Sequence, residues 1–201
     1  MNDRAPAPGG LVLIQSLVNT LDLESGADRL DTAEGRAAFG LAAGGTEAAR
    51  ELRESLRAVC LAHADHPPHR PVTPLGELLA GAPLYLTVDG RDGGAGFAPA
   101  VPAVPAVPAV PAVPAVPVVL SASAALSAPT TPSPAVNGSL ISRVAAAIAE
   151  SLVDGTWARL KACEASTCHW AYYDRSPAGR GRWCSMSVCG ARAKMRRYRA
   201  K

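Results

Sequence analysis

The chain has 201 residues, a formal net charge of +3 and 48% hydrophobic residues, many of them Ala and Val in one low-complexity stretch. This length allows one domain, or one domain with a small module. The apolar run from Leu11 to Leu23 is interrupted by polar residues, which argues against a membrane span or a signal core. We therefore expect a cytoplasmic protein without a membrane partner, where clustered cysteines bind metals more often than they form disulfides.

Residues 1–97 are predicted to form a mostly helical domain. Apolar residues at helical spacing from Leu11 to Leu21 predict its first helix. Asp31 is expected to cap a second, weaker helix, and Thr46 to cap a third helix with a clear apolar stripe. Cys60 lies on that stripe, so we expect a buried small side chain there and not a reactive thiol.

Three histidines, His63, His66 and His69, follow in the stretch "HADHPPHRP". Their spacing suggests a metal cluster, but Pro67 and Pro68 interrupt any helix that would place the three imidazoles on one face. We therefore favour a solvated loop. After this loop, a short helix is predicted to end before Gly81.

A β-hairpin and a linker are predicted next. The segment Leu84–Val88 reads as a strand that enters a tight turn, with its partner near Phe97. Residues 98–138 are predicted to be a linker or an expanded loop, because residues 100–117 are six copies of Ala-Val-Pro, which favours polyproline II. Residues 139–156 are expected to form a helix that completes the N-terminal domain.

The last segment, residues 157–201, holds four of the five cysteines in the pattern Cys163-x4-Cys168-x15-Cys184-x4-Cys189. Two short pairs separated by a loop are typical of a tetrahedral thiolate site, so we predict one structural Zn²⁺ per chain. Two disulfides and an iron–sulfur cluster are the alternatives. His169 follows Cys168 directly, and we expect it outside the zinc shell because adjacent residues rarely point at one metal.

This C-terminal module, defined as residues 157–201, is predicted to contain a hairpin around the loop "DRSPAGRGR" and a helix from Ser187 to Arg199. Aromatic residues on both sides of the loop are expected to cover the metal: Trp170, Tyr172, Tyr173 and Trp183. An apolar seam of Ala191, Met195 and Tyr198 is expected to dock the helix on the module. We also expect the module to fold separately from the helical domain.

The charge is divided unevenly along the chain. Residues 1–156 carry 9 basic and 15 acidic side chains, a balance of −6, whereas residues 157–201 carry 11 basic and 2 acidic ones, a balance of +9. Such asymmetry indicates an anionic partner for the basic end, although a solvated tail is the alternative. The expected nucleic-acid contacts are Arg180, Arg182, Arg192, Lys194, Arg196, Arg197, Arg199 and Lys201.

Together these elements predict an α+β fold, with a mostly helical N-terminal domain that has a short β-hairpin, and a small four-cysteine zinc finger built from a hairpin and a helix. The stretch "RWCSMSVCGARAKMRRYRAK", with "YYDRS" before it, resembles the CGNR zinc finger. The opening stretch, with "VNTLD", is similar to the ABATE domain that precedes this finger in the family. The resemblance implies a stress-induced transcriptional regulator, with the four cysteines as zinc ligands and Arg192 as the motif arginine. Ala191 stands where the motif has asparagine.

Two functions remain open at this stage. The first is a zinc-dependent regulator that binds duplex DNA, with the helical domain forming a homodimer or sensing a small-molecule effector. The second is a zinc-stabilised module that binds RNA or an acidic protein. We expect no enzyme, because the chain has no recognisable catalytic set, phosphate loop or open metal position.

Overall fold

The computed structural model describes residues 4–90, 94–99 and 139–200 and has the predicted α+β character. The repeat at residues 100–117, the rest of the predicted linker from residue 100 on, and Lys201 lie outside the described residues. The main helices are α1 (Leu11–Val18), α3 (Thr46–Ala62), α5 (Leu140–Val153) and α6 (Ala191–Arg199). Shorter helices are α2 (Ala33–Ala37) and α4 (Leu75–Leu79), and single turns are η1 (Arg29–Asp31), η2 (Ala43–Gly45) and η3 (Trp157–Arg159).

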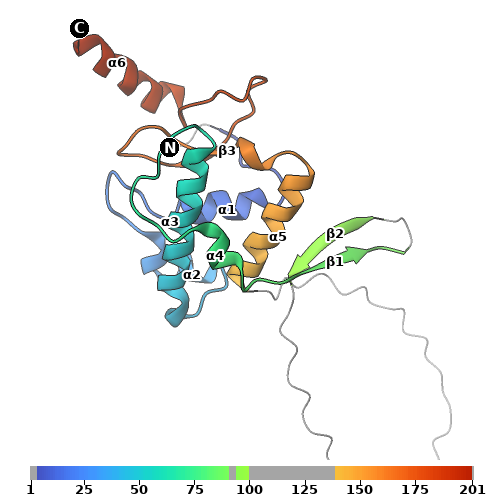
Figure 1. The fold of residues 1–201 in the computed structure, drawn as a ribbon. Helices are drawn as coiled ribbons and strands as arrows, with labels where there is room; N and C mark the ends of the chain where they lie inside the picture. Colours follow the sequence, from blue (N-terminus) through green and yellow to red (C-terminus); the bar gives the residue numbers. More distant parts are fainter. Residues whose placement is uncertain (1–3, 91–93, 100–138, 201) are drawn as a thin grey trace, which may run out of the picture.

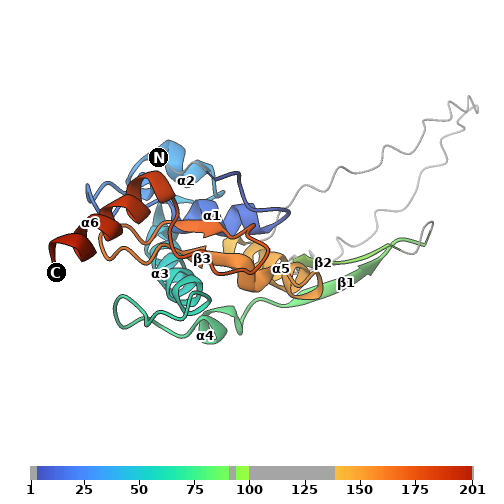
Figure 2. The same ribbon diagram turned by 90° about the horizontal axis from the view of Figure 1, so that it is seen from above.

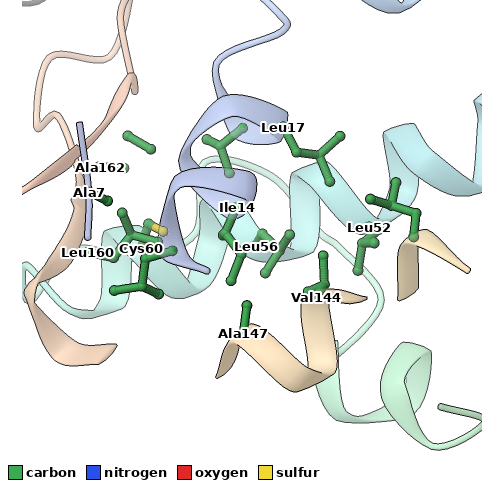
Figure 3. Packing of buried hydrophobic residues seen from close by; sticks show 14 of the residues in the cluster. Ala7, Ile14, Leu17, Leu52, Leu56, Cys60, Val144, Ala147, Leu160 and Ala162 are labelled. Atoms are coloured by element: carbon green, nitrogen blue, oxygen red, sulfur yellow. The ribbon is translucent and has the colours of Figure 1, made fainter. Parts of the chain in front are cut away.

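Helices α1, α3 and α5 surround one hydrophobic core (Figures 1 and 3). Ile14 and Leu17 of α1, Leu56 of α3 and Val144 of α5 are completely buried. Cys60 lies in the same core, and burial raises the pKa of its thiol to about 12. The prediction of a buried, unreactive Cys60 is therefore confirmed.

The start of α2 differs from the prediction by one residue. Thr32, and not Asp31, caps this helix, because its hydroxyl oxygen accepts a hydrogen bond from the Gly35 amide at 3.0 Å. Asp31 instead ends the preceding turn η1, which Asp28 caps. The predicted cap of α3 is also displaced by one residue: Thr46 is the first residue of that helix, and Gly45 occupies the cap position. The short turns before both helices shift these positions.

The first hairpin pairs the two predicted strands, but its second strand includes residues 98 and 99, which were predicted to begin the linker. Strand β1 (Leu84–Val88) pairs with strand β2 (Ala95–Pro99) in an antiparallel register that places Leu86 opposite Phe97. The hairpin begins beside α5 and extends away from the helical body (Figures 1 and 2).

The second hairpin differs from its prediction. Strand β4 (Ala171–Tyr173) pairs with strand β3 (Leu160–Ala162), which precedes the first cysteine, and not with the chain around Trp183. The carbonyl of Arg182, next to Trp183, accepts a hydrogen bond from the Glu164 amide at 3.0 Å instead of from β4.

This second hairpin belongs to the core of the helical domain. Leu160 and Ala162 of β3 and Ala171 of β4 are fully buried in the cluster that contains Ile14 and Leu56 (Figure 3). The C-terminal module therefore shares its hydrophobic core with the helices, which argues against the expected separate folding unit.

The histidine loop is not the solvated loop that the prolines suggested. The Nδ1 atom of His63 lies 2.8 Å from the Leu160 carbonyl oxygen, and its ring meets the Trp157 ring edge-on at 5.1 Å. The Nε2 atom of His69 lies 2.9 Å from a carboxylate oxygen of Glu54. The contacts of His63 link the end of α3 to the C-terminal module, and the contact of His69 holds the loop against α3. Tertiary packing and not local sequence therefore decides the environment of the loop.

The stability of the fold is expected to fall as the pH drops below about 6.5. Burial lowers the pKa of His63 and of His69 in the folded chain, whereas the unfolded chain protonates both near pH 6.5. Their neutral forms thus contribute stability that is present above about pH 6.5 and is lost as the pH falls through the folded pKa values. Thermal melts in excess zinc measure this. His63→Gln and His69→Gln should each flatten the profile, and an unchanged profile in both would contradict the assignment.

Candidate metal centre

The structure brings the four predicted cysteines together. Cys163 follows β3, Cys168 lies in the next turn, Cys184 follows the long loop, and Cys189 lies in the π-helical turn η4 (Met186–Gly190). Their sulfur atoms all lie within 4.8 Å of one another, and all except the half-buried Cys168 are buried. Backbone turns close both pairs, as in the hydrogen bond from the Cys168 amide to the Ala165 carbonyl at 2.8 Å.

The spacing of these sulfur atoms fits a tetrahedral zinc ion. Zinc–thiolate bonds of about 2.3 Å imply sulfur–sulfur distances of roughly 3.8 Å. The sulfur of Cys184 lies 3.6 Å from that of Cys168 and 3.7 Å from that of Cys189. All five cysteines are free thiols. The four clustered residues thus form a site for one structural Zn²⁺, which would hold the two turns together and leave no open coordination position.

His169 is directed away from this set of ligands. Its Nδ1 atom lies 3.1 Å from the Cys163 carbonyl oxygen, and its ring lies 5.7 Å from the ring of His69. Its backbone has a φ of +47°, an uncommon conformation for a residue other than glycine. This backbone conformation turns the His169 ring away from the Cys168 sulfur. The His169 ring instead contacts the backbone of Cys163.

A small apolar cluster covers the metal site. It consists of buried Ala165 and Tyr172 with half-buried Trp170 and Trp183 around the cysteines. Three of the four aromatic residues predicted for this role therefore take it. The fourth, Tyr173, faces the core of the helical domain instead, because neighbouring residues of β4 point to opposite sides.

The loop between the cysteine pairs is organised around Asp174, which is fully buried. Its carboxylate accepts hydrogen bonds from the amides of Ser176 at 3.1 Å and Gly181 at 2.7 Å. Burial would raise the pKa of Asp174, but these bonds and nearby Lys161 hold it below its usual range. A Cβ atom at Gly181 would lie 2.9 Å from this carboxylate, so the loop requires glycine there.

Side chains of the helical domain hold the C-terminal module in place, and the sequence reasoning missed them. Asn19 forms two hydrogen bonds with the backbone of Ala171, accepting from its amide at 2.7 Å and donating to its carbonyl at 2.9 Å. Gln15 also donates to this carbonyl. Near the N-terminus, Arg4 lies over the Tyr172 ring at 4.5 Å. The only signal for these roles was the "VNTLD" stretch, which contains Asn19.

The basic helix α6 does not dock on the module as predicted. It has no buried residue, and it extends from η4 away from the body of the protein (Figures 1 and 2). Within the expected seam, Met195 is 51% exposed and Tyr198 is 78% exposed. The predicted docking is therefore wrong: the described hydrophobic residues that pack around the metal site all lie between Cys163 and Cys189, before α6 begins.

Five of the eight predicted nucleic-acid contacts line two separate hollows. Arg192, Arg196 and Arg199 line one hollow along η4 and α6, together with Val188 and Met195. Arg180 and Arg182 line another hollow, with Lys161 and His66. The structure therefore brings three of the helical arginines together on one face but separates them from the loop arginines.

Ion pairs already hold two of these arginines. Arg182 pairs with Glu164 inside the module. Arg192 pairs with Glu24 of the helical domain at 3.0 Å. For the other described cations of α6, the structure shows no ion pair with any described residue: Lys194, Arg196, Arg197 and Arg199.

Comparison with known protein families supports the assignment of the metal. The model of the CGNR zinc finger family matches residues 159–201. This match covers the C-terminal module and all four cysteines. Comparison with curated proteins finds no match. In the part of the chain that the structure describes, every helix is too short or too polar to cross a bilayer.

Proposed function

We propose that the chain is a zinc-dependent transcriptional regulator that binds duplex DNA through α6. The observation that carries this proposal is a projecting helix with exposed cations at its surface, held at its base by the metal centre. Cys189 lies one turn before Arg192, so the zinc site fixes the direction in which α6 leaves the module. Four thiolates close the zinc shell, so the proposal contains no catalytic step.

The dimensions of α6 suit the major groove. An α-helix with its side chains is about 10–12 Å across, and the groove is about 12 Å wide. Arg192, Arg196 and Arg199 share a hollow with the exposed side chain of Met195. Arginines along a groove contact phosphates or guanine edges, and an apolar side chain between them suits a thymine methyl group.

The helical domain is proposed to regulate this binding in response to stress, by forming a homodimer or by recognising a small-molecule effector. This part of the proposal rests on the resemblance of the opening stretch to the ABATE domain. The alternative function, binding to RNA or to an acidic protein, uses the same basic helix and is an outcome of the test below.

Binding of a random-sequence duplex is expected to weaken steeply with salt. The logarithm of the binding constant should fall with a slope of about −0.9 per phosphate neutralised. Arg196→Ala/Arg199→Ala should reduce this slope by roughly two units if both side chains contact phosphates. Titration of a labelled duplex at several salt concentrations measures the slope.

The matched control is Arg29→Ala/Arg70→Ala, which removes two exposed arginines of the helical domain and should leave the slope unchanged. If the wild type binds single-stranded RNA or an acidic protein but no duplex, the alternative function replaces this one. If both double variants reduce the slope equally, net charge and not α6 explains the binding.

A further inference from the structure

The ion pair between Glu24 and Arg192 connects parts of the chain that are 168 residues apart. One guanidinium nitrogen of Arg192 lies 3.0 Å from both carboxylate oxygens of Glu24. The two side chains are 62% and 52% exposed, so solvent and other anions reach the pair. It is also the one ion pair that the structure shows between α6 and the rest of the described chain.

The loop that carries Glu24 is held in one shape. One carboxylate oxygen of Asp22 accepts a hydrogen bond from the Glu24 amide at 3.0 Å, and the other accepts one from the Ser25 hydroxyl at 2.8 Å. The Gly26 amide donates to the Asp22 carbonyl at 2.8 Å. Gly26 has a φ of +75°, which glycine adopts without strain. Glu24 is thus presented by an ordered turn of the helical domain.

This turn lies beside the metal centre. Asp22 and Glu24 line a hollow of about 140 Å³ together with Cys168, Trp170 and Arg192. The turn therefore places two carboxylates next to the start of the basic helix. A phosphate that approached Arg192 from this side would meet both of them.

We propose that Glu24 is a built-in competitor for Arg192, so that a nucleic-acid phosphate has to displace it before Arg192 binds. Carboxylate and phosphate oxygens accept hydrogen bonds from the same guanidinium N–H groups, so the two contacts compete. The contact is autoinhibitory: the helical domain masks the α6 cation nearest to the zinc site. A movement that carries Glu24 away from α6 would release Arg192. This inference rests on the proposed function of α6 as the polyanion-binding element.

The expected gain on removing Glu24 is modest, because an exposed ion pair contributes little. Glu24→Gln should tighten binding about twofold to fivefold at low salt. The gain should disappear as the salt concentration rises, since salt screens exposed charges. The melting temperature should change little. Tighter binding would then come from the freed Arg192 and not from partial unfolding.

The experiment compares variants by their elution from immobilised heparin and by titration of a labelled duplex. Glu77→Gln is the matched control, because it removes the same charge from an exposed residue of α4. Glu24→Gln should elute later than the control and bind the duplex more tightly. In an Arg192→Ala background, Glu24→Gln should give no further gain if the competition is specific.

The outcomes separate the inference from the proposed function. If the wild type binds the duplex and Arg196→Ala/Arg199→Ala weakens it, but Glu24→Gln behaves like Glu77→Gln, the competition is absent and the proposed function stands. An equal gain with and without Arg192 would show general repulsion and overturn the inference. If the wild type does not bind the duplex, the proposed function is wrong, and elution from heparin still tests whether Glu24 competes for Arg192. If the wild type binds neither the duplex nor heparin, both the proposed function and this inference are wrong.

Discussion

Replacing Cys184 with serine is expected to reduce the bound zinc from one ion per chain to almost none. The sulfur of Cys184 lies 3.6 Å from that of Cys168 and 3.7 Å from that of Cys189. A serine hydroxyl is a poor zinc ligand at neutral pH, so the closed shell is lost. Structural zinc contributes roughly 10–16 kcal/mol of apparent binding energy in finger peptides, and the apolar cluster around this site is small.

The loss of zinc should also destabilise the helical domain. Leu160 and Ala162, which precede the first ligand, are buried in the core formed by α1, α3 and α5. Unfolding of the module would expose that side of the core, so Cys184→Ser should lower the melting temperature of the helical signal in circular dichroism. The size of this decrease reports how strongly the two parts are coupled.

Cys60→Ala is the control for this experiment. Cys60 is buried in the core but lies outside the metal site. The variant should keep one zinc per chain in elemental analysis while losing some stability through a small cavity. Retention of equimolar zinc by Cys184→Ser would remove Cys184 from the ligand set. A normal melt without zinc would show that the helical domain folds independently.

The features that the sequence predicted correctly depend on residues close together in the chain. The two cysteine pairs each close a short turn, so two close pairs separated by a loop indicated a metal site. Helix α3 has a regular apolar stripe ending at Cys60. The two paired strands of the first hairpin lie within 16 residues, Leu84–Pro99. Local rules describe such elements well.

The features that the sequence did not predict depend on choices between distant partners. Strand β4 was predicted to pair with the chain around Trp183, but it pairs with β3, whose Leu160 is buried in the core with residues of α1 and α3. The seam of Met195 and Tyr198 had the spacing of a docking face, but spacing does not show whether a surface is available. Glu24 carried no signal in its neighbourhood, because its partner lies 168 residues away.

A buried charge network in α3 also depends on partners that are distant in the sequence. Arg57 is 1% exposed, and it donates to Glu54 at 2.7 Å and to the Val18 carbonyl at 2.8 Å. Glu54 is 2% exposed and also accepts from Arg53 at 2.7 Å. Burial would raise the pKa of Glu54, but the two arginines outweigh it and hold this pKa below its usual range. The helical pattern placed these side chains off the apolar stripe and did not show that other segments enclose them.

Replacing Arg57 with alanine is therefore expected to cost about 3–5 kcal/mol of unfolding free energy, because removing one partner leaves the other charge buried with less compensation. It would also leave the Val18 carbonyl at the end of α1 without this donor. For a chain of this size, such a loss lowers the melting temperature by roughly 6–20 °C.

Arg50→Ala is the matched control: its side chain is 32% exposed and pairs with Asp28 and Asp31, so its loss should cost no more than about 1 kcal/mol. Urea unfolding of both variants in excess zinc measures the difference. Equal costs would mean that water reaches Glu54 in solution, and the network would then contribute no more than a surface ion pair.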